Sequence, residues 1–207
     1  MMSKESTEWN YSRAIVWPAS HLGGGSDFCW DDEGSLDWAI KTFEVKSMLD
    51  IGCGVGCQVK LARSKGLDSI GLDGDMSVFK DGLQEHIDFT LTKYKPKKQY
   101  DLIWSVEFLE HVDEEYIENY MPAFTAGKYI ICTHALPGQS GHHHVNCQPT
   151  AYWIELFDKY GFDYNDEYTA QMKAASTMEC RHSVKDPSIY VSGDYIRRNG
   201  LFFSKQK

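Results

Sequence analysis

Short apolar runs alternate with amphipathic stretches from residue 36 onward, and this alternation predicts the fold. Five apolar runs have the length and composition of buried strands. The predicted strands are residues 48–51, 69–72, 87–91, 100–106 and 128–133. Between and after them, apolar residues recur at helical spacing. The predicted helices are residues 36–43, 55–65, 114–124, 150–160 and 167–178.

Strands that alternate with helices are typical of a doubly wound α/β fold, whose mostly parallel sheet carries helices on both faces. Residues 194–204 differ, because Arg197-Arg198-Asn199-Gly200 predicts a hairpin turn before an apolar run. A length of 207 residues fits one domain over residues 1–207. Residues 1–35 would form an irregular N-terminal cap, with its aromatic residues on the sheet edge and residues 23–26 as a candidate lid.

The strongest chemical signal is Asp-Ile-Gly-Cys-Gly-Val-Gly at residues 50–56, between a strand and a helix. Glycines let the backbone turn tightly and let a ligand approach the main chain. The dinucleotide fingerprint would need glycine where Cys57 stands, and no Gly-Lys-Ser/Thr follows as in a phosphate-binding P-loop. Asp73 comes 21 positions after Gly52, at the end of the next strand. A carboxylate there can accept both hydroxyls of an adenosine ribose.

These residues resemble the class I S-adenosylmethionine-dependent methyltransferases. Residues 50–56 match that family's first motif, and Gly71-Leu72-Asp73 matches its second-strand acid. Residues 100–105, followed by Glu107 and Glu110-His111-Val112, match its fourth-strand motif. The resemblance covers residues 45–135 well and extends weakly to about residue 165. It implies a seven-stranded sheet whose last strand is antiparallel, and S-adenosylmethionine as the cofactor.

The resemblance also implies roles for single residues at the carboxyl ends of the strands. Asp50 would help to hold the amino group of the cofactor, Asp73 its ribose and Asp88 its adenine amino group. The complete predicted cofactor set is Asp50, Gly52, Gly54, Gly56, Asp73, Gly74, Asp88, Phe89, Ser105 and Glu107.

A histidine-rich loop, residues 134–146, follows the fifth predicted strand, where a methyl acceptor should bind. A histidine there can remove a proton from a hydroxyl or amine as the methyl group transfers. We select His144 as the candidate base, because it leads directly into the next element, and His111 as the second candidate. The predicted acceptor-site residues are His143, Asn146, Tyr152 and Trp153. The alternative is an exposed polar loop without a role in the chemistry.

A divalent metal site is an open alternative at the fourth strand. Glu107, Glu110 and His111 are spaced i, i+3 and i+4, so they would share one face of a helical turn. Two carboxylates and an imidazole suit Mg²⁺, Mn²⁺ or Zn²⁺. The set is similar to that of the small-RNA 2′-O-methyltransferases and the ubiquinone-pathway O-methyltransferases, which add a later histidine. Here His134 or one of residues 142–144 would serve, but the same motif occurs in relatives without metal, so the primary prediction contains none.

The net charge and the cysteines limit the binding partners and the cellular compartment that we expect. The net charge is −9, whereas a protein that binds duplex DNA through many phosphates is normally basic, so we expect no duplex DNA partner. The Asn/Asp-Pro-Pro-Tyr motif of enzymes that methylate amines of DNA bases is absent from the sequence. Six cysteines without a Cys-x-x-Cys pair predict reduced thiols in a cytoplasmic protein. Neither a secretory signal core nor an apolar run of membrane-spanning length occurs, so we expect no membrane partner.

Together these observations predict a methyltransferase that acts on a hydroxyl of a small molecule or glycan, as a monomer or homodimer. The first alternative is a metal-assisted RNA 2′-O-methyltransferase. The second is a cofactor-binding module without turnover.

Overall fold

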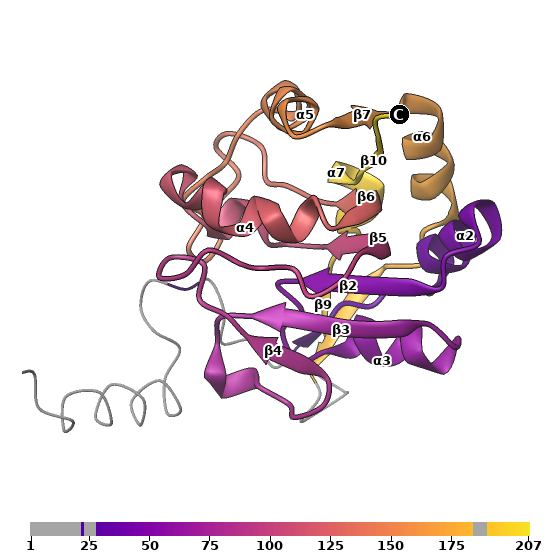
Figure 1. Cartoon of the computed structure of the whole chain (residues 1–207), viewed down its shortest axis with the longest axis horizontal. Helices are drawn as coiled ribbons and strands as arrows, with labels where there is room; N and C mark the ends of the chain where they lie inside the picture. The colour runs from indigo at the N-terminus through magenta and orange to yellow at the C-terminus, as the bar shows by residue number, and fades with distance from the viewer. Residues whose placement is uncertain (1–21, 23–27, 184–189) are drawn as a thin grey trace, which may run out of the picture.

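The computed structural model describes residue 22 and residues 28–183 and 190–207 (Figure 1). Its centre is a seven-stranded sheet with the order β4-β3-β2-β5-β6-β10-β7. The strands are β2 (Ser47–Ile51), β3 (Asp68–Asp73), β4 (Gln84–His86), β5 (Tyr100–Ser105), β6 (Gly127–Cys132), β7 (Phe162–Tyr164) and β10 (Leu201–Lys205). The first five pair in parallel, and β10 runs antiparallel to both β6 and β7. The predicted seven-stranded topology with an antiparallel last strand is confirmed.

Helices cover both faces of this sheet. Successive strand residues point to opposite sides, and apolar residues on each side pack against helices. On β5, Ile103 faces a core shared with α4 (Ile117–Phe124) and α5 (Thr150–Lys159). Leu102 and Trp104 face the other core, shared with α2 (Glu33–Phe43), α3 (Cys57–Ser64), α6 (Asp166–Ala175) and α7 (Tyr195–Asn199). Three short 3₁₀ turns complete the described helices: η1 (Met76–Val78), η2 (Leu109–His111) and η3 (Glu114–Tyr116).

Two predicted elements are wrong. The third strand is β4 rather than residues 87–91, because Asp88 starts a turn in which its carboxylate accepts the Thr90 amide at 2.9 Å. The predicted hairpin at residues 194–204 is the short helix α7 followed by β10. Ile196 is fully buried in the core, and helical geometry lets its carbonyl accept the Gly200 amide at 3.0 Å.

A second, three-stranded antiparallel sheet has the order β1-β8-β9. It joins β1 (Phe28–Cys29) to β8 (Cys180–Ser183) and β9 (Tyr190–Ser192). No sequence pattern predicted it, because its strands are only two to four residues long. Within the described ranges, no helix combines the length and apolar composition needed to cross a bilayer.

Asp32 fastens the start of α2 to two distant segments. Its buried carboxylate accepts the Ser35 amide at 2.9 Å as the N-cap, and the Thr177 amide at 3.0 Å. It also accepts the hydroxyl of Ser176, next to Thr177 after α6. The Asp32 amide donates to Gln58 Oε1 on α3 at 2.9 Å. One side chain therefore joins α2 to the segment after α6, while its backbone reaches α3.

We expect Asp32→Ala to lower the free energy of unfolding by about 2–4 kcal/mol, since it removes an N-cap and leaves buried donors without a partner. Denaturant unfolding measures this change. Asp31→Ala is the matched control, because Asp31 is exposed and its loss should cost less than about 0.5 kcal/mol. Equal stability of the two variants would show that the Asp32 network contributes nothing.

Candidate functional site

A narrow cleft lies at the carboxyl ends of β2 and β5. Open α/β sheets bind ligands at this edge. Three parts of the chain line the cleft: β1 with the residue after it, the ends of β2 and β5, and the start of α3. The lining residues are Phe28, Cys29, Trp30, Asp50, Gly52, Cys53, Val55, Cys57, Gln58, Trp104 and Val106.

The glycine loop turns sharply between β2 and α3. Gly52, Gly54 and Gly56 have φ angles of 74°, 52° and 76°, a region that side chains disfavour. The amides of Gly52 and Cys53 both donate to the carbonyl oxygen of Leu72 on β3, at 2.9 and 3.1 Å. A Cβ on Gly52 would also come within 2.8 Å of Phe108. The loop therefore requires glycine at position 52 for its backbone and for its packing.

Two acidic side chains flank this loop. Asp73 accepts the Gly54 amide at 2.7 Å and the Asp75 amide at 2.8 Å. Burial raises the pKa of Asp73 to about 6, against the opposing effect of these amides. Asp50 is 3% exposed, and burial followed by the charge of Asp73 raises its pKa well above the ordinary range. A cationic ligand beside these carboxyls would favour their charged forms.

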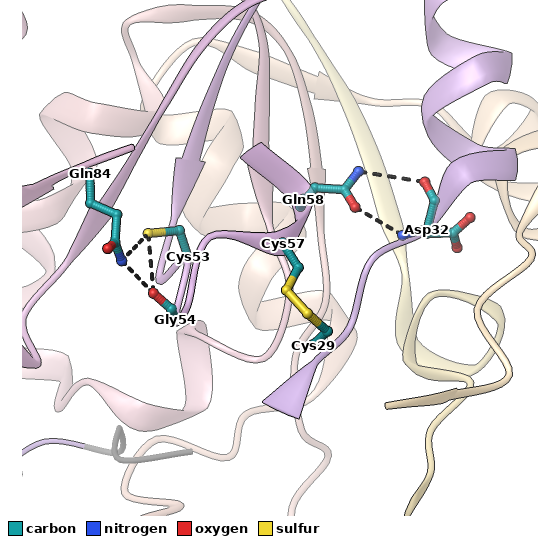
Figure 2. Close-up of a disulfide and its surroundings, with 7 residues drawn as sticks. All are labelled: Cys29, Asp32, Cys53, Gly54, Cys57, Gln58 and Gln84. Carbon is teal, nitrogen blue, oxygen red and sulfur yellow. Dashed lines mark hydrogen bonds between the residues drawn. A yellow bond between two sulfur atoms is a disulfide. The ribbon is translucent and has the colours of Figure 1, made fainter. Parts of the chain in front are cut away.

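Gln84, the first residue of β4, holds the glycine loop from the other side (Figure 2). It is 5% exposed, and its Nε2 donates to the carbonyl oxygen of Gly54 and lies 3.2 Å from Cys53 Sγ. Sequence reasoning missed this positioning residue. Its only signal is its place in a polar run that shows no strand periodicity.

A second group of side chains gathers beyond β5 and β6. Ligand atoms of Glu110, His111 and His144 all lie within 4.8 Å of one another. The backbone holds them there, because the amides of Val145 and Asn146 donate to the Glu110 carbonyl oxygen at 2.9 and 3.0 Å. The sequence predicted that the segment around His144 is anchored, and the anchor is the turn after β5.

Burial shifts the pKa values of Glu110 and His111 in this cluster toward their neutral forms. Glu110 is fully buried, and by geometry neither side-chain oxygen has a hydrogen-bond partner in the described part of the chain. Burial, followed by the charge of Glu107, raises its pKa well above the ordinary range. Burial and the nearby His144 lower the pKa of His111 to about 4, so His111 is neutral at pH 7.

The tautomers of both imidazoles follow from their partners. Nδ1 of His111 lies 3.2 Å from the carbonyl oxygen of His143, and Nδ1 of His144 lies 3.0 Å from that of Gln139. A carbonyl oxygen only accepts, so each Nδ1 carries the hydrogen. In the neutral rings the lone pair is therefore on Nε2, and for His144 this atom packs against Gly141.

The other predicted cofactor residues have varied surroundings. Ser105 is fully buried and donates to the Ile51 carbonyl oxygen at 3.1 Å, which ties β5 to β2. Phe89 packs in the core against Phe108. The Gly74 carbonyl oxygen lies 2.9 Å from Nε2 of His86. The Glu107 amide donates to Thr133 Oγ1 at 2.8 Å, with a φ of 55° at Glu107.

The predicted acceptor-site residues also spread out. Asn146 is buried, and its amide nitrogen donates to the Val112 carbonyl oxygen at 3.1 Å. Trp153 is fully buried in the core, whereas the Tyr152 hydroxyl donates to Glu114 at 2.7 Å. The backbone of His143 contacts His111, as described above. The candidate lid, residues 23–26, lies outside the described residues.

The prediction of six reduced cysteines is wrong. Cys29 and Cys57 form a disulfide with a Cα–Cα distance of 5.6 Å (Figure 2). Because the two cysteines are 28 positions apart and form no Cys-x-x-Cys pair, no pattern in the sequence indicates this pairing. Cys53, Cys132 and Cys147 are free thiols.

A family model described as a methyltransferase domain matches residues 35–126, which contain the glycine loop, Asp73 and the strand β5. Residues 35–126 therefore belong to a class I S-adenosylmethionine-dependent methyltransferase domain. Its cofactor is S-adenosylmethionine, as the resemblance implied. A search of curated proteins finds no match to the methyltransferase.

Solved structures share the fold. The methyltransferase domain of bacterial CtHen1-C is 17% identical, with a TM-score of 0.53, and the match covers 84% of this chain and 96% of that one. Magnesium protoporphyrin IX methyltransferase from Synechocystis, solved with bound S-adenosylhomocysteine, is 14% identical with a TM-score of 0.51, covering 83% and 80%. Human N-acetylserotonin methyltransferase is 14% identical with a TM-score of 0.52, and the match covers 84% of this chain and 51% of the human chain.

The raised pKa of Asp73 predicts a pH-dependent affinity for the cofactor. Below about pH 6 the carboxyl binds a proton, so Asp73 would lose the anionic form that the predicted ribose contact needs. We expect the Kd for S-adenosylmethionine to rise about tenfold between pH 7 and pH 5, as measured by calorimetric titration.

Two variants test the assignment to Asp73. Asp73→Asn should bind weakly at pH 7 and flatten the profile near pH 6, whereas Asp81→Asn, at an exposed acid, should keep the wild-type profile. An unchanged profile in Asp73→Asn would remove Asp73 from the cofactor site.

Proposed function

We propose that the methyltransferase acts on a hydroxyl group of a small molecule or glycan, with His144 as the general base. The observation that supports this proposal is the hydrogen bond between Nδ1 of His144 and Gln139, which leaves Nε2 as the basic atom. His144 lies beside Glu110 and His111 at the edge of the sheet where the strand β5 ends.

The chain's own residues would hold the reactants and move one proton. When bound, S-adenosylmethionine supplies an electrophilic methyl group on a sulfonium. Asp50 and Asp73 would hold its amino group and ribose, which aligns the donor with the acceptor. Nε2 of His144 would take the hydroxyl proton as the acceptor oxygen forms its bond to the methyl carbon. The bond between that carbon and the sulfonium sulfur would break in the same step, with S-adenosylhomocysteine as the leaving group. His111, neutral at pH 7, would add no positive charge that opposes this transfer.

The loop that carries His144 favours an acceptor with an apolar part. Leu136 and Val145 are 43% and 40% exposed on this loop and would offer apolar contacts to such an acceptor. Two of the structures with this fold are named for acceptors of small size, N-acetylserotonin and magnesium protoporphyrin IX.

We expect His144→Ala to reduce kcat about 10²–10⁴-fold, because a positioned base contributes that much to the rate. The assay measures transfer of a radioactive methyl group from S-adenosylmethionine to a panel of hydroxyl metabolites and oligosaccharides. Binding of S-adenosylhomocysteine should not change. His142→Ala is the control, because His142 is exposed on the same loop. Equal losses in both variants, or none, would contradict the role of His144.

A metal-assisted enzyme that methylates the 2′-hydroxyl of RNA is the second candidate. The observation that favours it is the buried carboxylate of Glu110, which meets no hydrogen-bond partner among the described residues. Its ligand atom lies within 4.8 Å of those of His111 and His144. Metal-binding imidazoles commonly donate their second N–H to a carbonyl oxygen, as both of these rings do. A cation bound there would compensate the buried charge and polarise the acceptor hydroxyl.

We expect methyl transfer to survive EDTA, because the primary proposal needs no metal. Loss of activity in EDTA and its recovery with Mn²⁺ would instead establish the metal-assisted enzyme. Thermal unfolding supplies a second readout, since an ion that binds the folded state raises the Tm. In that case Mn²⁺ should stabilise the wild type but not Glu110→Gln, which keeps the shape and removes the charge.

A further inference from the structure

The disulfide joins two walls of the cofactor cleft. Cys57 is the first residue of α3, directly after the glycine loop, and Cys29 lies on β1 (Figure 2). Phe28, Cys29 and Trp30 line the same cleft as the glycine loop. We call residues 28–30 the cleft strap.

The segment that leads into α2 is held by different contacts at Asp32, next to the helix, and at the cleft strap. At Asp32 the backbone exchanges two hydrogen bonds with the Gln58 side chain, at 2.9 and 3.5 Å, and its carboxylate is bound as described above (Figure 2). The restraints on the cleft strap include the disulfide, a two-residue pairing of β1 with β8, and an edge contact of Trp30 with Tyr195. Breaking the disulfide would leave Asp32 anchored and remove the only covalent restraint on the strap in the described part of the chain.

We propose that Cys29 and Cys57 form a thiol–disulfide site that sets the affinity of the cleft for S-adenosylmethionine. With the disulfide intact, the strap is ordered before the cofactor arrives, so binding costs less conformational entropy. Reduction leaves the strap to be ordered by the cofactor itself, and the affinity falls. The inference rests on this cleft being the cofactor site.

The redox step needs a dithiol reductant. One of its thiolates attacks a disulfide sulfur, which breaks the Cys29–Cys57 bond and forms a mixed disulfide. The second thiolate displaces the remaining cysteine and closes a new disulfide in the reductant. Two electrons and two protons pass to the protein, which gains two thiols. Both cysteines are half-buried, which leaves part of each residue open to a small dithiol.

We expect reduction with dithiothreitol to raise the Kd for S-adenosylmethionine about tenfold, the effect of ordering one or two side chains. Calorimetric titration of the wild type before and after reduction measures this change, with a thiol count to establish each state. Cys29→Ser and Cys57→Ser should bind like the reduced wild type and not respond to dithiothreitol. Cys147→Ser, which removes a free thiol outside the cleft, should respond like the wild type.

Thermodynamic linkage gives a second test that does not depend on folding of the variants. If the oxidised form binds the cofactor about tenfold more tightly, saturating S-adenosylmethionine must lower the reduction potential of the disulfide by about 30 mV. Redox titration in glutathione buffers, with and without the cofactor, measures this shift.

The outcomes separate two kinds of failure. Equal affinity in both redox states, or an unchanged potential, overturns the redox inference and leaves the cofactor site intact. Absence of binding in both states overturns the inference together with the location of the cofactor site.

Discussion

The carbonyl oxygen of Leu72 accepts two consecutive amides, those of Gly52 and Cys53, and the cofactor site depends on this contact. It fixes the path of the chain as it leaves β2 and turns into α3. It also sets the distance between β2 and β3, so that Asp73 reaches the Gly54 amide. Because this turn requires positive φ angles and tolerates no Cβ against Phe108, it selects glycine at position 52.

A similar contact builds the other half of the site. The carbonyl oxygen of Glu110 accepts the amides of Val145 and Asn146, which brings the histidine loop back to the turn after β5. The backbone of Glu110 therefore positions the histidine loop, while the Glu110 carboxylate is buried. Such a carboxylate is costly unless it binds a proton or a cation. Whichever of the two neutralises Glu110 decides whether His144 acts alone or as a ligand.

The N-terminal cap contributes more than cover for the sheet edge. Its described part passes along the cleft as residues 28–30, and it is bound to α3 by a disulfide and to the segment after α6 by Asp32. The cleft at the carboxyl ends of β2 and β5 is thus completed by a segment outside the residues that match the family model.

The sequence by itself determined the doubly wound fold, the glycine loop and the acid at the end of β3. These features are local, since a strand, a turn and a helix follow one another along the chain and their periodicity survives without tertiary contacts. Even there, the apolar residues Phe89 and Ile196 suggest strands that the structure does not contain, because a buried side chain in a turn or a short helix resembles part of a strand in the sequence.

Only the tertiary structure decided which distant residues meet. The disulfide joins cysteines 28 positions apart, and Glu110 meets His144 across 34 positions of mostly irregular chain. Gln84 reaches the glycine loop from a strand of three residues. These encounters depend on the paths of loops, and loop paths are set by single backbone hydrogen bonds that leave no repeating pattern in the sequence.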